Sequence, residues 1–144
     1  MPRMGGARAD MAFMKMHGLG NDFVVIDARG RGVGVTPDLA RAMADRHRGI
    51  GFDQLAVISN SGRADAHLTF YNADGSLSAA CGNATRCIAR FLMDEAGRDA
   101  LTLESDHGLL PVRDAGGGLT AVNMGPARTR WCSAAASSPG RPWR

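Results

Sequence analysis

The 144 residues are 44% hydrophobic and 22% charged, with 19 glycines and three cysteines, a composition that excludes a disordered or collagen-like chain and is typical of one globular domain. The net charge of +3 arises at the two ends of the sequence, and no basic stripe with interleaved aromatic residues is present, so we expect no nucleic-acid partner. The apolar runs are far too short to cross a bilayer and the first residues lack the order of a signal peptide, which predicts no membrane segment and a cytoplasmic location.

The beginning of the chain predicts an extension followed by two strands. Residues 1–11 are small and charged and show no apolar period, which is typical of a disordered extension. Residues 13–17 alternate and residues 23–26 are continuously apolar, as strands often are. Because the glycine-rich segment 18–22 breaks the pattern between them, we expect two strands joined by a Gly-rich loop.

A helix and two further strands are expected next. Thr36 is a good N-cap residue and Pro37 suits the first helical position, so the apolar spacing after them predicts a helix over 37–47. Runs rich in apolar residues then predict strands over 55–58 and 66–71.

The strongest helix signal lies over residues 84–96. Apolar residues recur there at spacings of three and four, and Gly97 is placed to end the helix. The spacing predicts an apolar stripe made of Ala84, Cys87, Ile88, Phe91 and Leu92. The segments that follow predict an antiparallel meander of strands over 101–104, 109–113 and 119–124.

Cys81 comes immediately before this helix. At a helix N-terminus, unpaired N–H groups and the positive end of the helix dipole favour a thiolate over a thiol, and they can also bind a carboxylate. Gly82 lets a ligand approach the backbone closely. A cysteine is often an inert buried hydrophobe, but the flanking Gly82 and Asn83 favour a functional role for Cys81.

The other two cysteines lack such a setting. Cys87 falls on the apolar stripe of the helix, where we expect it to pack in the core, and Cys132 is expected to be incidental. The spacing of Cys81 and Cys87 matches no usual zinc pattern, and nothing in the sequence indicates export. We therefore expect neither a metal site nor a disulfide framework.

Three loops at predicted strand ends, residues 18–22, 49–54 and 72–76, carry amide side chains. Uncharged amides and backbone groups bind carboxylates and ammonium ions without adding a fixed charge, so these loops are candidates for binding a zwitterion. Ordinary turn chemistry is the alternative for each loop. Turn or cap positions, rather than an acid/base pair, are expected for Asp22, Asp53 and Asp74.

Four segments, in this order, closely resemble the diaminopimelate epimerase family: MHGLGNDF at 16–23, GIGFDQ at 49–54, YNADGS at 71–76 and CGNATRC at 81–87. The resemblance covers about residues 13–127 and corresponds to the first of the family's two similar domains. It implies an α+β fold in which a mixed, mostly antiparallel sheet wraps around a central helix.

The resemblance also implies a function. Family members are isomerases that interconvert LL- and meso-diaminopimelate for lysine and peptidoglycan synthesis, and they use two cysteines without pyridoxal phosphate, another cofactor or a metal. Two thiols are needed because a single fixed base would mostly return the proton to the same face. Cys81 matches the first catalytic cysteine. Substrate binding is implied for Asn21, Gln54, Asn72, Gly82 and Asn83.

The family's second domain, with its second catalytic cysteine, has no counterpart in the sequence. The family pattern continues to about Trp131, after which the chain is small and rich in Pro, Gly, Ser and Arg, as a frame change would leave it. We therefore expect an epimerase-like domain over 12–127, an irregular tail over 128–144, and no efficient epimerisation by this chain alone. The expected partners are diaminopimelate and either a second copy of the chain or the missing C-terminal domain.

Two other functions stay open at this point. A non-catalytic module that binds an amino acid, or a half-enzyme that pairs with a separate domain, would keep the same four loops. A cysteine hydrolase would need a histidine base beside Cys81, and no motif in the sequence provides one.

Overall fold

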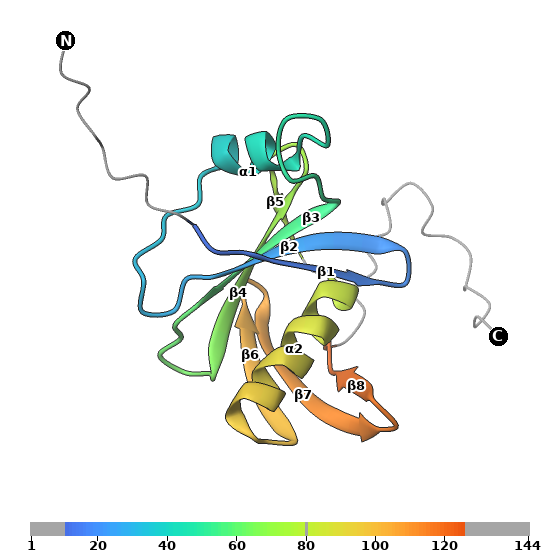
Figure 1. Ribbon diagram of the computed structural model, residues 1–144. Helices are drawn as coiled ribbons and strands as arrows, with labels where there is room; N and C mark the ends of the chain where they lie inside the picture. The colour runs from blue at the N-terminus through green and yellow to red at the C-terminus, as the bar shows by residue number, and fades with distance from the viewer. Residues whose placement is uncertain (1–10, 80, 126–144) are drawn as a thin grey trace, which may run out of the picture.

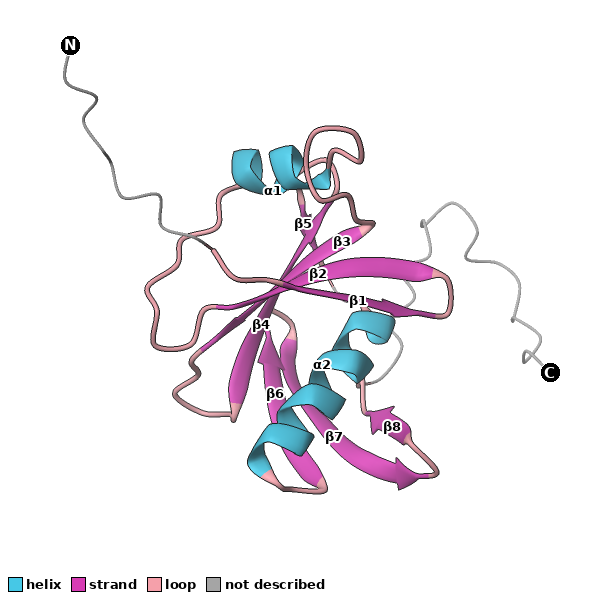
Figure 2. Cartoon of the chain, viewed as in Figure 1, coloured by secondary structure: helices cyan, strands magenta, loops and turns pink. Residues whose placement is uncertain are grey.

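The computed structural model describes residues 11–79 and 81–125, which form one curled sheet and two helices (Figures 1 and 2). The strands are β1 (Met14–Gly18), β2 (Asn21–Asp27), β3 (Gln54–Ser59), β4 (Ala66–Asn72), β5 (Leu77–Ser78), β6 (Ala100–Ser105), β7 (Gly108–Gly116) and β8 (Leu119–Val122). The helices are α1 (Pro37–Ala44) and α2 (Gly82–Ala96). Residues 1–10 of the predicted 1–11 extension and the predicted tail over 128–144 lie outside the described residues.

The sheet has eight strands in the order β1-β2-β3-β4-β6-β7-β8, with β5 paired to β4. The pairs β2/β3 and β4/β6 are parallel, and all the other pairs are antiparallel. The predicted α+β class with a mixed, mostly antiparallel sheet is therefore confirmed. The last three strands form the expected meander, whereas the two-residue β5 was not predicted.

Helix α2 lies inside the curl of the sheet, as Figure 1 shows, and contacts β1 and β2 on one side and β6, β7 and β8 on the other. Its buried residues are Ala84, Thr85, Ile88, Ala89, Leu92 and Met93. The predicted stripe was partly wrong, because Cys87 and Phe91 are only partly buried. Since strands cover the helix from two sides, its buried face is rotated toward Thr85, Ala89 and Met93.

The core consists of two clusters on opposite faces of β2 and β3. Phe23 and Val25 belong to the large cluster around α2, and Val24 and Ile26 belong to the small cluster under α1. Successive strand residues point to opposite faces, so β2 is buried on both sides, and β3 alternates in the same way. Met11 packs against the small cluster, so packed structure reaches into the predicted 1–11 extension.

Helix α1 begins as predicted and ends earlier than predicted. The Thr36 hydroxyl accepts a hydrogen bond from the Leu39 N–H at 3.1 Å, which confirms the N-cap. The helix stops at Ala44 because Asp45 takes an extended conformation. The Asp45 carboxylate then accepts hydrogen bonds from the N–H groups of His47 and Arg48 at 2.8 and 3.1 Å, so a side-chain-stabilised turn replaces the expected residues 45–47 of the helix.

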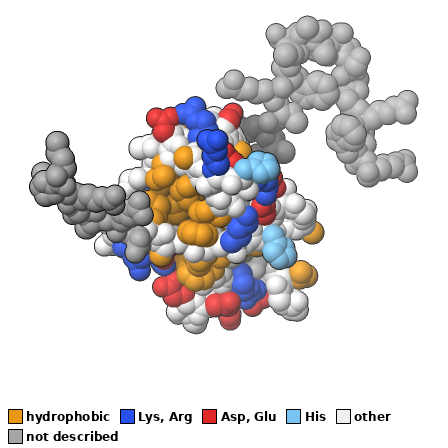
Figure 3. Space-filling model, turned by 45° about the horizontal axis from the view of Figure 1, so that its top comes forward, with side chains coloured by type: hydrophobic (Ala, Val, Ile, Leu, Met, Phe, Trp, Pro, Cys, Tyr) orange, Lys and Arg blue, Asp and Glu red, His pale blue; other side chains and the backbone are white. Residues whose placement is uncertain are grey.

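Neither helix in the described part of the chain combines the length and the apolar character that crossing a membrane requires. On the face shown in Figure 3, apolar side chains gather near the middle, and basic and acidic side chains are interspersed around them. This face therefore lacks the continuous basic surface typical of a nucleic-acid interface.

Candidate active site

One end of the sheet brings three of the predicted binding residues together. Asn21 and Gln54 are the first residues of the parallel strands β2 and β3, and Asn72 is the last residue of β4, which runs antiparallel to β3. Gln54 and Asn72 are direct neighbours in the register. Strand direction alone therefore gathers three amide side chains that are up to 51 positions apart in the sequence.

The N-terminus of α2 meets the same end of the sheet. A Cβ atom placed on Gly18 would lie 3.8 Å from the Cβ atom of Asn83 and 3.5 Å from the Sγ atom of Cys87. Gly18 is also the register partner of Asn21. The end of β1 therefore contacts the first turns of α2, and Asn21, which pairs with Gly18, lies next to this contact.

Cys81 is the N-cap residue of α2. Its Sγ atom accepts a hydrogen bond from the Ala84 N–H at 3.4 Å, and its carbonyl accepts from the Thr85 N–H at 2.9 Å and the Thr85 hydroxyl at 2.7 Å. The residue is 7% exposed and belongs to the large cluster. The Cys81 thiol thus lies at the helix N-terminus, as predicted, and is almost fully buried.

The first turn of α2 is suited to an anion. The N–H groups of Ala84 and Thr85 are used by Cys81, and those of Gly82 and Asn83 come before them at the positive end of the helix dipole. No acidic side chain lies in this turn. Arg86 donates a hydrogen bond to the Oδ1 atom of Asn83, which adds positive charge. These groups can therefore bind a carboxylate.

Cys87 has a different environment. It packs against the large cluster, as expected, but it remains partly exposed. A depression of about 440 Å³ beside it is lined by Leu19, Arg86, Cys87, Arg90, Gly118, Leu119 and Thr120. Burial raises the pKa of the Cys87 thiol above its ordinary value. Cys87 is therefore a poorer base at neutral pH than an unperturbed cysteine.

The amide side chains at the sheet end are hydrogen-bonded to one another. The Gln54 Nε2 group donates to the Asn72 Oδ1 atom at 3.4 Å and to the Ser78 hydroxyl at 3.1 Å. The Asn72 Nδ2 group donates to the Ser76 hydroxyl at 3.0 Å. Sequence reasoning missed Ser78, because its short strand carries no periodic signal.

Four charged side chains join the beginnings of β2 and β3. The Arg46 guanidinium donates to the Asp22 carboxylate at 2.8 and 2.9 Å and to Asp53 at 3.2 Å, and the Lys15 ammonium lies 3.1 Å from Asp22. The two aspartates also accept each other's backbone N–H at 3.2 Å. Asp22 and Asp53 therefore stabilise these loops through a charged cluster, rather than only as turn or cap residues.

This cluster predicts a pH dependence of stability. The Arg46 guanidinium, helped by Lys15, holds the pKa of Asp22 well below its usual range. A carboxylate whose pKa is lowered by folding stabilises the folded state at pH values above its pKa in the unfolded chain, which is about 4 for Asp. This stabilisation is lost as the pH falls toward the lower pKa of the folded state. We expect Asp22→Asn to lower the urea midpoint at pH 7 and to show a smaller further loss than the wild type on acidification.

Urea unfolding followed by circular dichroism between pH 7 and pH 3 measures this effect. Asp99→Asn is the matched control, because Asp99 is exposed and its carboxylate has no hydrogen bond or ion pair among the described residues. The plot of its urea midpoint against pH should run parallel to that of the wild type. If acidification lowered the urea midpoint equally in Asp22→Asn and the wild type, the prediction would be contradicted.

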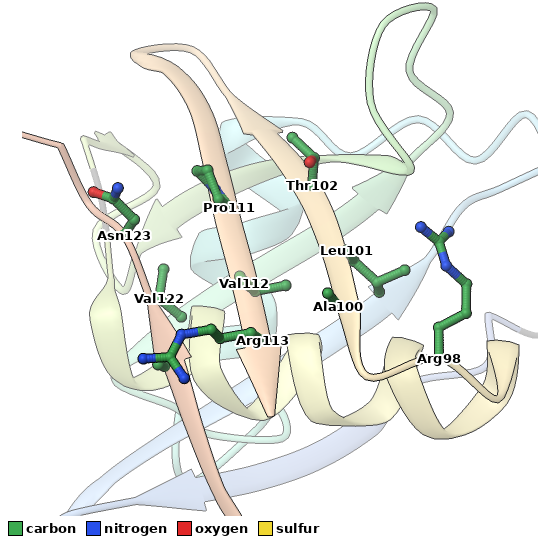
Figure 4. A pocket seen from close by; sticks show the side chains of 10 residues that line it. Arg98, Ala100, Leu101, Thr102, Pro111, Val112, Arg113, Val122 and Asn123 are labelled. Carbon is green, nitrogen blue, oxygen red and sulfur yellow. The ribbon is translucent and has the colours of Figure 1, made fainter. Parts of the chain in front are cut away.

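A separate hollow lies on strands β6 to β8 (Figure 4). Its volume is about 620 Å³, and its lining includes Arg98, Thr102, Pro111, Arg113 and Asn123. The sequence-predicted binding residues do not line it. Within residues 11–79 and 81–125, no three His, Cys, Asp or Glu side chains are grouped so that they could hold a metal ion.

Comparison with known proteins decides the family. The family model described as diaminopimelate epimerase matches residues 13–130. The chain belongs to the diaminopimelate epimerase family. The predicted resemblance is thereby confirmed over most of the chain, including the segments that carry Cys81 and the amide residues.

Curated members of the family match most of this chain. A diaminopimelate epimerase of Acidiphilium cryptum is 49% identical over 119 residues, which are 83% of this chain and 43% of the relative. One of Rhodospirillum centenum is 50% identical over 121 residues, which are 83% of this chain and 42% of the relative. The chain thus spans less than half the length of these diaminopimelate epimerases.

Solved structures support the fold. A hydroxyproline epimerase from Agrobacterium vitis matches with a TM-score of 0.55 and 17% identity, over 78% of this chain and 40% of that one. A methylitaconate-delta-isomerase matches with a TM-score of 0.54 and 15% identity, over 76% of this chain and 62% of that one. At these identities the likeness concerns the fold alone.

Proposed function

We propose that this chain provides one half of a diaminopimelate epimerase active site. In this proposal Cys81 is the acid/base thiol for one face of the substrate α-carbon. Gly82 and Asn83 bind the α-carboxylate, and Asn21, Gln54 and Asn72 bind the rest of the diamino diacid. The observation that supports it best is the meeting of these residues from three strands and one helix at a single end of the sheet.

The proposed proton transfer takes place at the N-terminus of α2, where Cys81 is the N-cap residue. The Cys81 thiolate takes the α-proton, and the electron pair left on carbon is delocalised into the adjacent carboxylate. The N–H groups of Gly82 and Asn83 stabilise the added negative charge on that carboxylate. No cofactor enters this scheme, because the carboxylate itself accepts the electron pair.

Inversion needs a second thiol on the opposite face of the carbon. We assign it to a segment that completes the site, since the family relatives are more than twice as long as the part they share with this chain. Both thiols must stay reduced, and we therefore place the reaction in the cytoplasm. The low exposure of Cys81 limits access of water to the reacting atoms.

Thiol labelling tests the assignment of Cys81. With limiting iodoacetamide at pH 7.5, we expect Cys81 to be alkylated faster than Cys87 although it is less exposed. The Cys81 Sγ atom lies at the positive end of the helix dipole and accepts a hydrogen bond from the Ala84 N–H, and both stabilise negative charge on an attacking sulfur, whereas burial raises the pKa of Cys87. Peptide mass spectrometry identifies the modified cysteine. Diaminopimelate should protect Cys81 and leave the alkylation of Cys87 unchanged.

Pimelate with 1,5-diaminopentane, each at the same concentration as diaminopimelate, is the matched control. This mixture offers both charges without an α-amino acid, and it should give no protection. Equal labelling of the two cysteines without protection would contradict a catalytic Cys81 and favour a module that only binds an amino acid.

A further inference from the structure

A chain of hydrogen bonds links four side chains at the end of the sheet that carries the candidate site, those of Asp74, Ser76, Asn72 and Gln54. The Ser76 hydroxyl lies 2.5 Å from the Asp74 Oδ1 atom and accepts from the Asn72 Nδ2 group at 3.0 Å. The Asn72 Oδ1 atom in turn faces the Gln54 Nε2 group at 3.4 Å. A side branch connects this same Nε2 group to the Ser78 hydroxyl at 3.1 Å.

The charge of Asp74 sets the direction of this chain of hydrogen bonds. Hydrogen bonds from Ser76 lower the pKa of Asp74, so its carboxylate is ionised near neutral pH and can only accept. The single hydroxyl proton of Ser76 therefore goes to Asp74, and the Ser76 oxygen must accept from Asn72. This turns the Nδ2 group of Asn72 toward Ser76 and its Oδ1 atom toward Gln54.

The same reasoning determines what Gln54 can offer. An amide nitrogen has two protons, and those of Gln54 are directed to Asn72 and Ser78. The Oε1 atom, an acceptor, is the part of this amide that is left for a ligand. We propose that Asp74 and Ser76 orient the Asn72–Gln54 amide pair so that Gln54 accepts a hydrogen bond from an ammonium group of the substrate. The ligand part of this inference rests on the proposed function.

The turn that carries Asp74 and Ser76 is well supported. The Asn72 N–H donates to the Ser76 carbonyl at 2.8 Å, and the Gly75 N–H donates to the Asn72 carbonyl at 3.0 Å. The Asp74 carboxylate also accepts from the Ser76 N–H at 2.9 Å. Gly75 is buried against the first residue of α1, so the turn is packed on one side. Asp74 and Ser76 are thus positioning residues, which act on a ligand through Asn72 and Gln54.

The side-chain amide signals of the 144-residue chain test the orientation without any ligand. In ¹⁵N-resolved NMR spectra, we expect Ser76→Ala to shift the NH₂ signals of both Asn72 and Gln54 and to accelerate their proton exchange with water several-fold. Ser76→Thr, which keeps the hydroxyl, should restore both. Asp74→Asn should act in the same direction as Ser76→Ala, and Asp99→Asn, a matched change at an exposed aspartate, should leave both signals in place.

A titration with two diacids tests the ligand assignment. We expect the wild type to bind diaminopimelate more tightly than pimelate, which has the same carboxylates and no ammonium group. Ser76→Ala should lose most of this preference, because its affinity for diaminopimelate should fall more than its affinity for pimelate. Chemical-shift changes during the titration give both affinities, and a thermal unfolding scan shows whether each variant is folded.

The outcomes separate the two parts of the inference. Amide signals of Gln54 that do not respond to Ser76→Ala would overturn the orientation by Asp74 and Ser76. Wild-type affinity for pimelate equal to that for diaminopimelate would overturn the ammonium assignment. If the wild type bound neither compound, the proposed function and the ammonium assignment would both fail, and the amide signals would still decide the orientation.

Discussion

Replacement of Cys81 by serine is expected to slow the exchange of the α-proton of diaminopimelate for deuterium by at least about 100-fold. In deuterated water the wild-type chain should introduce deuterium at the α-carbon and leave the configuration unchanged, because one thiol serves only one face. A serine hydroxyl holds its proton far more tightly than a thiol does and cannot replace the thiolate as the base. Mass spectrometry follows the deuterium, and chiral chromatography separates the LL and meso forms.

Cys87→Ser is the matched control for this experiment. It removes the other free thiol of the described residues, and we expect it to keep the wild-type exchange rate because we assign Cys87 no role in proton transfer. Rapid interconversion of the LL and meso forms by the wild-type chain would contradict the need for a second thiol. Exchange that continues undiminished in Cys81→Ser would contradict the role of Cys81.

Gly75→Ala is expected to lower the free energy of unfolding by about 3 kcal/mol or more. Gly75 has a φ of +84°, which strains any residue with a side chain. A Cβ atom there would also lie 2.5 Å from the carbonyl oxygen of Pro37, which is backbone and cannot turn aside. The turn over 72–76 would have to leave α1, and the Asn72 side chain would move with it.

Gly116→Ala separates the two causes. Gly116 has nearly the same φ, +83°, but apart from its own chain neighbours no atom of the described residues lies within 4 Å of the position that its Cβ would take. This variant should lose only the conformational part, about 1 kcal/mol. Urea unfolding at pH 7 measures both free energies. Similar losses in the two variants would show that the contact between Gly75 and Pro37 contributes nothing to stability.

Sequence patterns predicted the elements whose signals are local. Helix α2 could be placed because its apolar spacing is regular and Gly97 ends it in a left-handed conformation. The early end of α1 depends on the Asp45 side chain, which competes with the helix for N–H groups. The rotation of the buried face of α2 results from strands on two sides and has no counterpart in its own sequence.

In the candidate site, too, local features could be predicted from the sequence and tertiary contacts could not. Its residues could be named from four motifs, but the contact between Gln54 and Asn72 depends on strand register, which a single sequence does not reveal. The cluster of Lys15, Asp22, Arg46 and Asp53 joins three separate segments, and no periodic pattern connects them. One signal was present, since Asp22 follows Asn21 and Asp53 precedes Gln54, so each acid is adjacent to a predicted binding amide.

The burial of β2 and β3 on both faces has a consequence for how the site could adapt to different ligands. A shift of either strand by one residue would exchange its two sets of apolar side chains between the clusters, which makes such sliding very unfavourable. The backbone positions of Asn21 and Gln54, the first residues of these two strands, are therefore fixed by the core. Any adjustment to the length of a bound molecule has to come from the turns before these strands.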